Sequence, residues 1–165
     1  MDYCYIEFAS KDTNSLYRAI ELFTMIKVAK ETDETTNDRP FINYLTDAER
    51  SYFWNPSPEE EQEWSDEWFS TPIEIRLSSR MLIPPWGLES MLDGFWMGDY
   101  ELIDIQEQKG KYYLRFDPHS YPYGGTGCMV ALLECLGHRV VGINDGAGYE
   151  KYTPKTEFWK PKKNG

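Results

Sequence analysis

The stretch from residue 111 to residue 145 constrains the fold of this chain more than any other. In order, it reads as a strand, a glycine-rich loop, an apolar helix and a second strand. Alternating side chains predict the first strand over 111–117, and the uninterrupted apolar run from Cys128 to Leu133 predicts a buried helix. Gly137 suits the position just after that helix, where the backbone is commonly left-handed. The stretch therefore predicts a βαβ-like unit built on a sheet.

The remaining chain predicts an α+β fold in which helices pack on a mixed sheet of about five strands. Tyr5-Ile-Glu-Phe8 and Tyr113-Leu-Arg-Phe116 echo each other, because each is followed by a polar loop and a helix. Two such units on one sheet indicate a ferredoxin-like or related arrangement. The patterns place strands at 2–8, 71–83, 100–107, 111–117 and 138–145, and the longer helices at 12–30, 86–97 and 126–136.

Length and charge divide the chain into one domain, an acidic insertion and a basic tail. At 165 residues the chain is long enough to bury a core without disulfides or metals. We expect a single domain over 1–154, in which 31–70 is an acidic, partly helical insertion, and a basic tail over 155–165. The formal charge is −11, and residues 31–70 carry twelve acids against two arginines, a net of −10. Nearly all of the excess charge therefore lies in one quarter of the chain.

Helix starts explain part of the acidic insertion. Thr46 with Glu49, and Ser57 with Glu60, have the spacing of a capping box, in which the two side chains bond the free N–H groups that begin a helix. Acidic residues in a first turn also suit the helix dipole. Helix capping is enough to explain these acids, without any functional role.

Trp64 and Trp68 lie four residues apart, so they share one face of the second of these helices. Two interpretations stay open: both pack onto the sheet, or both form an aromatic anchor inside an acidic rim, as at protein-binding hot spots. The second predicts a non-catalytic protein of the inhibitor, immunity or regulatory type, which binds another protein that is basic. Nucleic acid is not an expected partner, because the acidic insertion would repel phosphates. The predicted binding residues are Trp54, Glu59, Glu60, Glu61, Trp64 and Trp68.

The alternative is a small enzyme or ligand-binding domain that uses the glycine-rich loop. Glycines before a helix leave backbone N–H groups free to bind an anion, and the loop offers Gly124, Gly125, Thr126 and Gly127. A second glycine-rich loop, 144–148, would lie close to the first if the two preceding strands were parallel neighbours. The first loop matches neither of the common nucleotide-binding glycine motifs. Its glycines are also what a tight turn needs for its own backbone.

The residues that would carry catalysis in this alternative are Cys128, His119 and Asp117, with His138 as another candidate base. A cysteine in the first turn of a helix has its thiolate stabilised by the helix dipole. The helix that carries it has only Glu134 as a charged residue, which instead favours a thiol buried as a small apolar side chain. The sequence leans toward a protein without catalytic activity.

The cysteines and the lack of long apolar segments indicate the cellular compartment in which the protein is expected. Cys128 and Cys135 lie two helical turns, roughly 10 Å, apart, which is too far for a disulfide. Residues 1–8 lack the features of a signal peptide. The longest apolar run falls far short of the ~20 residues that span a bilayer. We expect a cytoplasmic protein without membrane association or a cofactor, and two histidines without a spaced cysteine pair argue against a metal site.

Overall fold

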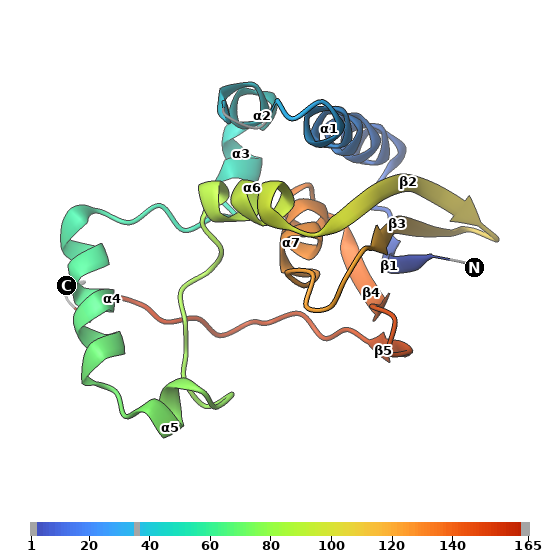
Figure 1. Ribbon diagram of the computed structural model, residues 1–165. Helices are drawn as coiled ribbons and strands as arrows, with labels where there is room; N and C mark the ends of the chain where they lie inside the picture. The colour runs from blue at the N-terminus through green and yellow to red at the C-terminus, as the bar shows by residue number, and fades with distance from the viewer. Residues whose placement is uncertain (1–2, 35–36, 163–165) are drawn as a thin grey trace.

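The computed structural model describes residues 3–34 and 37–162 and contains a five-stranded sheet with helices packed against it (Figure 1). The strand order is β2-β3-β1-β4-β5, and all four pairings are antiparallel. The predicted strand at 2–8 begins with Asp2, which lies outside the described residues, as does Lys163 of the tail. The strands are β1 (Cys4–Ala9), β2 (Tyr100–Gln108), β3 (Lys111–Pro118), β4 (Arg139–Asn144) and β5 (Tyr149–Lys151).

Two strand–helix–strand units interlock in this sheet. One runs from β1 through α1 (Thr13–Glu31) to β2, and the other from β3 through α7 (Gly127–Cys135) to β4. The two strands of each unit are separated by one strand of the other unit. Strand β3 lies between β1 and β2, and β1 lies between β3 and β4. This is the ferredoxin-like order, with β5 added at one edge. The α+β fold with five strands is confirmed, although adjacent strands are antiparallel throughout and β3 and β4 are not neighbours.

The core lies between the sheet and the helices. Ile6 and Phe8 of β1, and Leu114 and Phe116 of β3, are at most 1% exposed, whereas the residues between them face the other side of the sheet. Seven of the nine residues of α7 are buried, so this helix is enclosed on nearly every side. A continuous apolar run without amphipathic spacing is what such a central helix requires.

The end of α7 follows the sequence-based expectation. Gly137 has φ of 90°, and its N–H donates to the carbonyl of Glu134 at 2.9 Å. The N–H of His138 donates to the carbonyl of Leu133 at 3.1 Å, which completes a Schellman motif. Glycine is required here because other residues are strained at positive φ.

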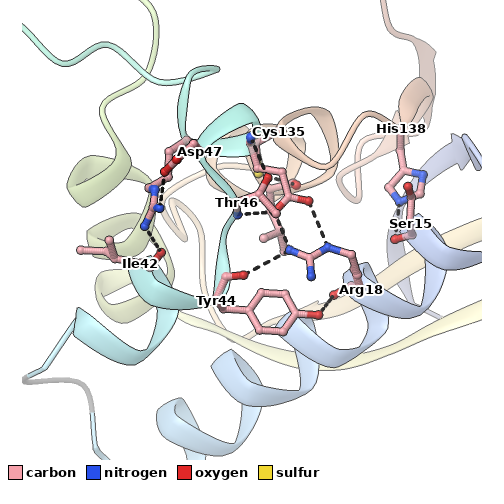
Figure 2. Close-up of polar contacts among 11 residues, drawn as sticks. Ser15, Arg18, Ile42, Tyr44, Thr46, Asp47, Cys135 and His138 are labelled. Carbon is pink, nitrogen blue, oxygen red and sulfur yellow. Dashed lines mark hydrogen bonds and ion pairs between the residues drawn. The ribbon is translucent and has the colours of Figure 1, made fainter.

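Helices α2 (Arg39–Tyr44) and α3 (Asp47–Arg50) are fastened to α1 by one arginine (Figure 2). The Arg18 guanidinium donates to both oxygens of Glu49, with Nε 3.0 Å from Oε2. Glu49 also accepts the backbone N–H of Thr46 at 2.8 Å, as the predicted capping box requires. Burial opposes ionisation of Glu49, but the hydrogen bonds from Arg18 and Thr46 lower its pKa below the usual value. One acid of the segment 31–70 thus joins α3 to the body of the protein.

The predicted strand at 71–83 is wrong. The chain instead forms a single helical turn, α5 (Ile73–Arg76), followed by irregular structure as far as Pro85. Alternation of Ile73, Ile75 and Leu77 indicated a strand, but Ile73 and Leu77 are 56% and 81% exposed. A strand needs a neighbouring edge to pair with, and this segment lies far from the sheet (Figure 1). The following helix, α6 (Leu88–Met97), lies where the sequence predicts it.

Residues 55–87 form an arm that projects away from the sheet (Figure 1). The arm consists of α4 (Pro58–Ser70), α5 and the irregular segment that returns to α6. Neither α4 nor α5 contains a fully buried residue. The C-terminal segment runs from β5, crosses the returning segment of the arm and ends beside the middle of α4 (Figure 1). The acidic segment 31–70 is therefore divided between α2 and α3, which pack on the body, and α4 in the arm.

Candidate binding surface

A cluster of tryptophans holds the arm together. The ring of Trp159 lies 5.2 Å from that of Trp64 and 6.2 Å from that of Trp54, and Trp64 lies 5.9 Å from Trp68. Trp159 is only 8% exposed, and its backbone N–H donates to the carbonyl of Ile83 at 2.9 Å. The interpretation in which Trp64 and Trp68 pack onto the sheet is wrong. Trp64 packs on Trp159 of the tail, and Trp68 packs on Trp64 and the Arg76 guanidinium, which spacing within one helix cannot reveal.

The same tryptophans line a groove of about 860 Å³ between α4 and the segment before α6. Trp54, Trp64, Trp68 and Trp86 line the groove, and Glu61 also borders it. The arm meets the body at this point, where the N–H of Trp54 donates to the carbonyl of Trp86 at 2.8 Å. The structure therefore brings four of the six predicted binding residues to one concave surface.

An apolar patch continues from this groove over the arm. The described chain has twelve exposed large apolar side chains, and six of them lie between residues 69 and 86. Phe69 and Leu77 are the most exposed of the six, at 76% and 81%. A concentration of exposed apolar side chains in one segment is typical of interaction sites, whereas single exposed apolar residues are common on any protein. The patch members are Phe69, Ile73, Leu77, Leu82, Ile83 and Trp86.

The acids of α4 divide into helix-starting and surface residues. Glu60 accepts the N–H of Ser57 at 3.2 Å, so it completes the predicted capping box, whereas Glu59 and Glu61 are exposed. Glu63 accepts the backbone N–H of Lys162 at 2.7 Å, and Glu67 lies 3.7 Å from the Lys162 ammonium. The basic tail thus covers one side of the acidic helix.

The alternative nucleophile, Cys128, is buried among aromatic and apolar groups. It is 3% exposed, its sulfur lies 3.3 Å from the Tyr100 hydroxyl, and burial raises the pKa of its thiol to about 11. A thiol with such a pKa carries almost no thiolate at neutral pH. Gly94 packs directly on it, since a Cβ at that position would lie 2.9 Å from the Cys128 Cβ. The geometry does not favour Cys128 as a nucleophile.

The candidate partners of Cys128 have other surroundings. His119 is exposed, and its Nδ1 lies 3.4 Å from the Asp99 carboxylate. Asp117 lies opposite Glu101 on the neighbouring strand. His138 accepts the N–H of Lys11 through Nδ1 at 3.1 Å, so its Nε2 carries the proton donated to the carbonyl of Ser15 at 3.0 Å. Both ring nitrogens of His138 are occupied in this way, and burial lowers its pKa.

The glycine-rich loop has a structural explanation at each glycine. Gly124 and Gly125 have φ of 104° and 81°, and a Cβ at Gly127 would lie 2.5 Å from the Trp86 ring. Thr126 precedes the helix without a side-chain capping bond. The loop does approach the second glycine-rich loop, because the Tyr121 hydroxyl donates to the carbonyl of Asp145 at 2.8 Å. Anion binding by Gly124, Gly125, Thr126 and Gly127 stays a prediction.

Sequence reasoning missed a smaller cavity of about 380 Å³ beside α7. Glu134 lines it and accepts hydrogen bonds from the hydroxyls of Tyr52 at 2.8 Å and Tyr152 at 3.4 Å. Burial and the contact with Glu134 raise the pKa of Tyr152 to about 12. The sequence feature that could have indicated this cavity is Glu134, the one charged residue of an otherwise apolar helix.

Comparison of the chain with protein-family models, with curated proteins and with solved structures finds no match. Across residues 3–34 and 37–162, no helix combines the length and apolar character needed to cross a membrane. Within those same ranges, no three His, Cys, Asp or Glu side chains converge where a metal ion could bind. Because no relative informs the function, the functional proposal rests on the residues of this chain and their geometry.

Proposed function

We propose that this protein acts by binding a basic protein through the arm, as an inhibitor, immunity protein or regulator. The observation that supports the proposal is the concentration of exposed apolar side chains between residues 69 and 86, next to an acidic helix. Neither α4 nor α5 buries a residue completely, so the arm leaves apolar surface that a partner would cover.

Charge and shape on the arm select the kind of partner. Glu59, Glu61 and Asp66 are exposed on α4, beside the groove that Trp64 and Trp68 line. Aromatic side chains in a desolvated pocket supply most of the binding energy at many interfaces, and surrounding charges speed association. A partner with an apolar side chain for the groove and lysines or arginines around it matches both features.

Affinity capture from a host lysate tests the proposal. The immobilised protein should retain a basic partner at low salt and lose it as salt rises, because the charges on α4 are exposed and screened. The charge-reversed pair Glu59→Lys with Glu61→Lys should lose the partner, and it leaves the capping residue Glu60 intact. Glu21→Lys with Glu107→Lys changes net charge equally at exposed sites outside the arm and should retain it. Equal loss in both pairs would count against the arm as the binding surface.

A second candidate function is binding of a small ligand in the cavity beside α7, which Thr126 and Gly127 of the glycine-rich loop also line. Its volume, about 380 Å³, lies within the range of small-molecule sites, and Glu134 and Lys155 are the charged groups among its largely apolar and aromatic walls. A ligand there should raise the melting temperature of the wild-type protein but not of Ala131→Trp, which fills the cavity. A screen of small cationic and aromatic compounds by thermal shift measures this.

A further inference from the structure

The side of the sheet opposite the helices carries a row of tyrosines. Residues that alternate with the buried ones on β1 and β3 must face this side, and they include Tyr5 and Tyr113. The two rings meet edge to face with centroids 5.1 Å apart, and Tyr149 lies 6.4 Å from Tyr5. We call Tyr3, Tyr5, Tyr113 and Tyr149 the tyrosine face; Tyr3 and Tyr149 are 36% and 48% exposed.

A glycine shapes this face at β4. Tyr149 lies across Gly142, because a Cβ added to Gly142 would lie 2.1 Å from the Tyr149 hydroxyl. In register, Gly142 is opposite Glu7, which is buried beneath the aromatic rings at 9% exposure. A side chain at position 142 would push Tyr149 away from Tyr5. The tyrosines therefore lie close to the sheet and form a continuous surface.

Cationic groups lie on the same side of the sheet. Arg115 donates to both oxygens of Asp104, each at 2.7 Å, and its guanidinium lies 5.1 Å from the ring of Tyr3. Lys111 is exposed and shares this side with Tyr113 and Arg115, because alternate residues of a strand face the same way. Lys151, opposite Gly142 on β5, adds a third cation. The face combines aromatic rings with cations, as in sites that bind single-stranded nucleic acid.

The strand that carries Tyr113 resembles the aromatic strand of RNA-binding sheets in its residue pattern. In such four-stranded sheets, aromatic side chains on the exposed face stack bases. Their strand pattern has a basic residue and a glycine first, then aromatic residues at the third, fifth and eighth positions. Here Lys109, Gly110, Tyr113 and Phe116 match four of these five positions, while Lys111 replaces the aromatic residue at the third and Tyr112 replaces a small residue at the fourth. Tyr113 is the residue that faces outward.

The charge argument against nucleic acid does not extend to this face. It rests on residues 31–70, and six of their twelve acids lie on α4, in the arm. The arm and the sheet occupy opposite ends of the molecule (Figure 1). At physiological salt, interactions between exposed charges are screened beyond about 8 Å. The charges of the face itself therefore decide what approaches the sheet. Register places three cations there (Lys111, Arg115 and Lys151) against four acids (Glu7, Glu101, Asp104 and Asp117), so the face is nearly neutral.

We propose that the tyrosine face binds single-stranded nucleic acid, with bases stacked on Tyr5 and Tyr113 and the backbone near Lys111. The balance of charge on this face implies that stacking supplies more of the affinity than phosphate contacts do. Stacking is tolerant of sequence, because every base offers an aromatic face. Double-stranded nucleic acid keeps its bases stacked on each other, so it should bind far more weakly.

Fluorescence anisotropy with a labelled oligouridine of about 12 nucleotides, a length suited to such sites, tests the proposal. Tyr113→Ala should weaken binding roughly five- to 150-fold, the range for loss of one base-stacking ring. Tyr113→Phe keeps the ring and should bind nearly as the wild type does. Tyr17→Ala removes a tyrosine that is 65% exposed on α1, across the sheet, and should change nothing. Circular dichroism of each variant establishes that the sheet is intact.

A second measurement separates stacking from charge. Lys111→Gln should leave binding at low salt within a few fold and reduce the dependence of affinity on salt by about one phosphate contact. Three results would overturn the proposal: no binding of oligouridine by the wild type, equal loss in Tyr113→Phe and Tyr113→Ala, or equal affinity for a duplex of the same length. Arm variants such as Glu59→Lys with Glu61→Lys should bind the oligonucleotide as the wild type does, so failure of the protein-binding proposal is detected independently.

Discussion

Trp159 packs its ring 5.2 Å from that of Trp64, although the two residues are far apart in sequence and belong to different parts of the chain. This contact joins the C-terminal segment to α4. Among the residues of the arm and tail that the structure describes, Trp159 is the only buried one, at 8% exposure. The order of the arm therefore depends on a residue that lies outside it.

Removal of the Trp159 ring should loosen the arm without unfolding the body. Burial of a Trp side chain is commonly worth about 3–5 kcal/mol on truncation to Ala, and here that energy couples the tail to α4. Trp159→Ala should accelerate hydrogen exchange of amides in 58–76, while amides of β1 and α7 keep their protection. Phe158→Ala, which removes the neighbouring and less buried ring, is the matched control. Uniform acceleration in all elements would contradict an arm that opens independently.

Exposed apolar residues of the arm should be dispensable for folding. Leu77→Ser alters a side chain that is 81% exposed, so the free energy of unfolding should change by no more than about 0.5 kcal/mol. Binding of the captured partner should nevertheless fall. Met97→Ser changes a side chain that is 85% exposed but outside the arm, and it should leave partner binding intact. Denaturant titration and the capture experiment together measure both outcomes.

Acid should destabilise the protein through the carboxylates paired with arginines. Hydrogen bonds from Arg115 lower the pKa of Asp104, and those from Arg18 and Thr46 lower that of Glu49 against the opposing effect of burial. The folded-state pKa values lie below the unfolded ones, near 4. The stabilisation is therefore complete above about pH 5 and is lost as pH falls through the folded-state values. Chemical denaturation from pH 6 to pH 3 measures this loss.

The Arg18–Glu49 pair should account for an identifiable part of that pH dependence. Arg18→Met leaves a carboxylate that is only 15% exposed without its cation, so it should destabilise at neutral pH and flatten the acid slope. Arg50→Met, whose partner Asp47 is 98% exposed, should change stability by less than about 1 kcal/mol. An unchanged acid slope in Arg18→Met would show that Glu49 is not the titrating group.

Cysteine reactivity should follow burial. Cys128 has a pKa raised to about 11 and Cys135 is also buried, whereas Cys4 is partly exposed. Iodoacetamide at neutral pH should therefore label Cys4 first, and the native Cys4→Ser variant should react slowly until denaturant is added. Rapid labelling of Cys128 in the native Cys4→Ser protein would revive the nucleophile hypothesis.

Gly127 should be required for packing against the Trp86 ring. A Cβ at Gly127 would lie 2.5 Å from that ring, so Gly127→Ala should destabilise by about 1–3 kcal/mol, typical of overpacking. Gly87→Ala adds a methyl group that would lie 3.4 Å from the Ser90 hydroxyl, and it should be tolerated. Trp86→Leu in the Gly127→Ala background should restore stability if the ring is the cause. Thermal denaturation of the four proteins measures these differences.

Several elements of the fold could be predicted from short-range patterns. The capping boxes at Thr46 and Ser57 and the left-handed Gly137 are local, because each is decided within a few residues of chain. The apolar run of α7 predicted its burial for the same reason. The prediction of a strand at 71–83 failed because alternation of side chains says nothing about whether a second strand is available for pairing. No sheet edge lies near this segment.

Of the candidate sites, the sequence predicted which side chains are present but not what they meet. It placed Trp64 and Trp68 on one face, yet the contact of Trp64 with Trp159 joins residues that are about a hundred positions apart. It likewise suggested Cys128 with His119, which the fold separates by burying one and exposing the other.

The stretch from 111 to 145 by itself determined a strand, a glycine turn, a buried helix and a second strand, since hydrophobic period and glycine conformation act locally. The insertion of β1 between its two strands was decided only by the tertiary structure, because strand pairing joins residues without regard to their separation in sequence. The same pairing brought Tyr5 beside Tyr113 and created a face that no single segment contains.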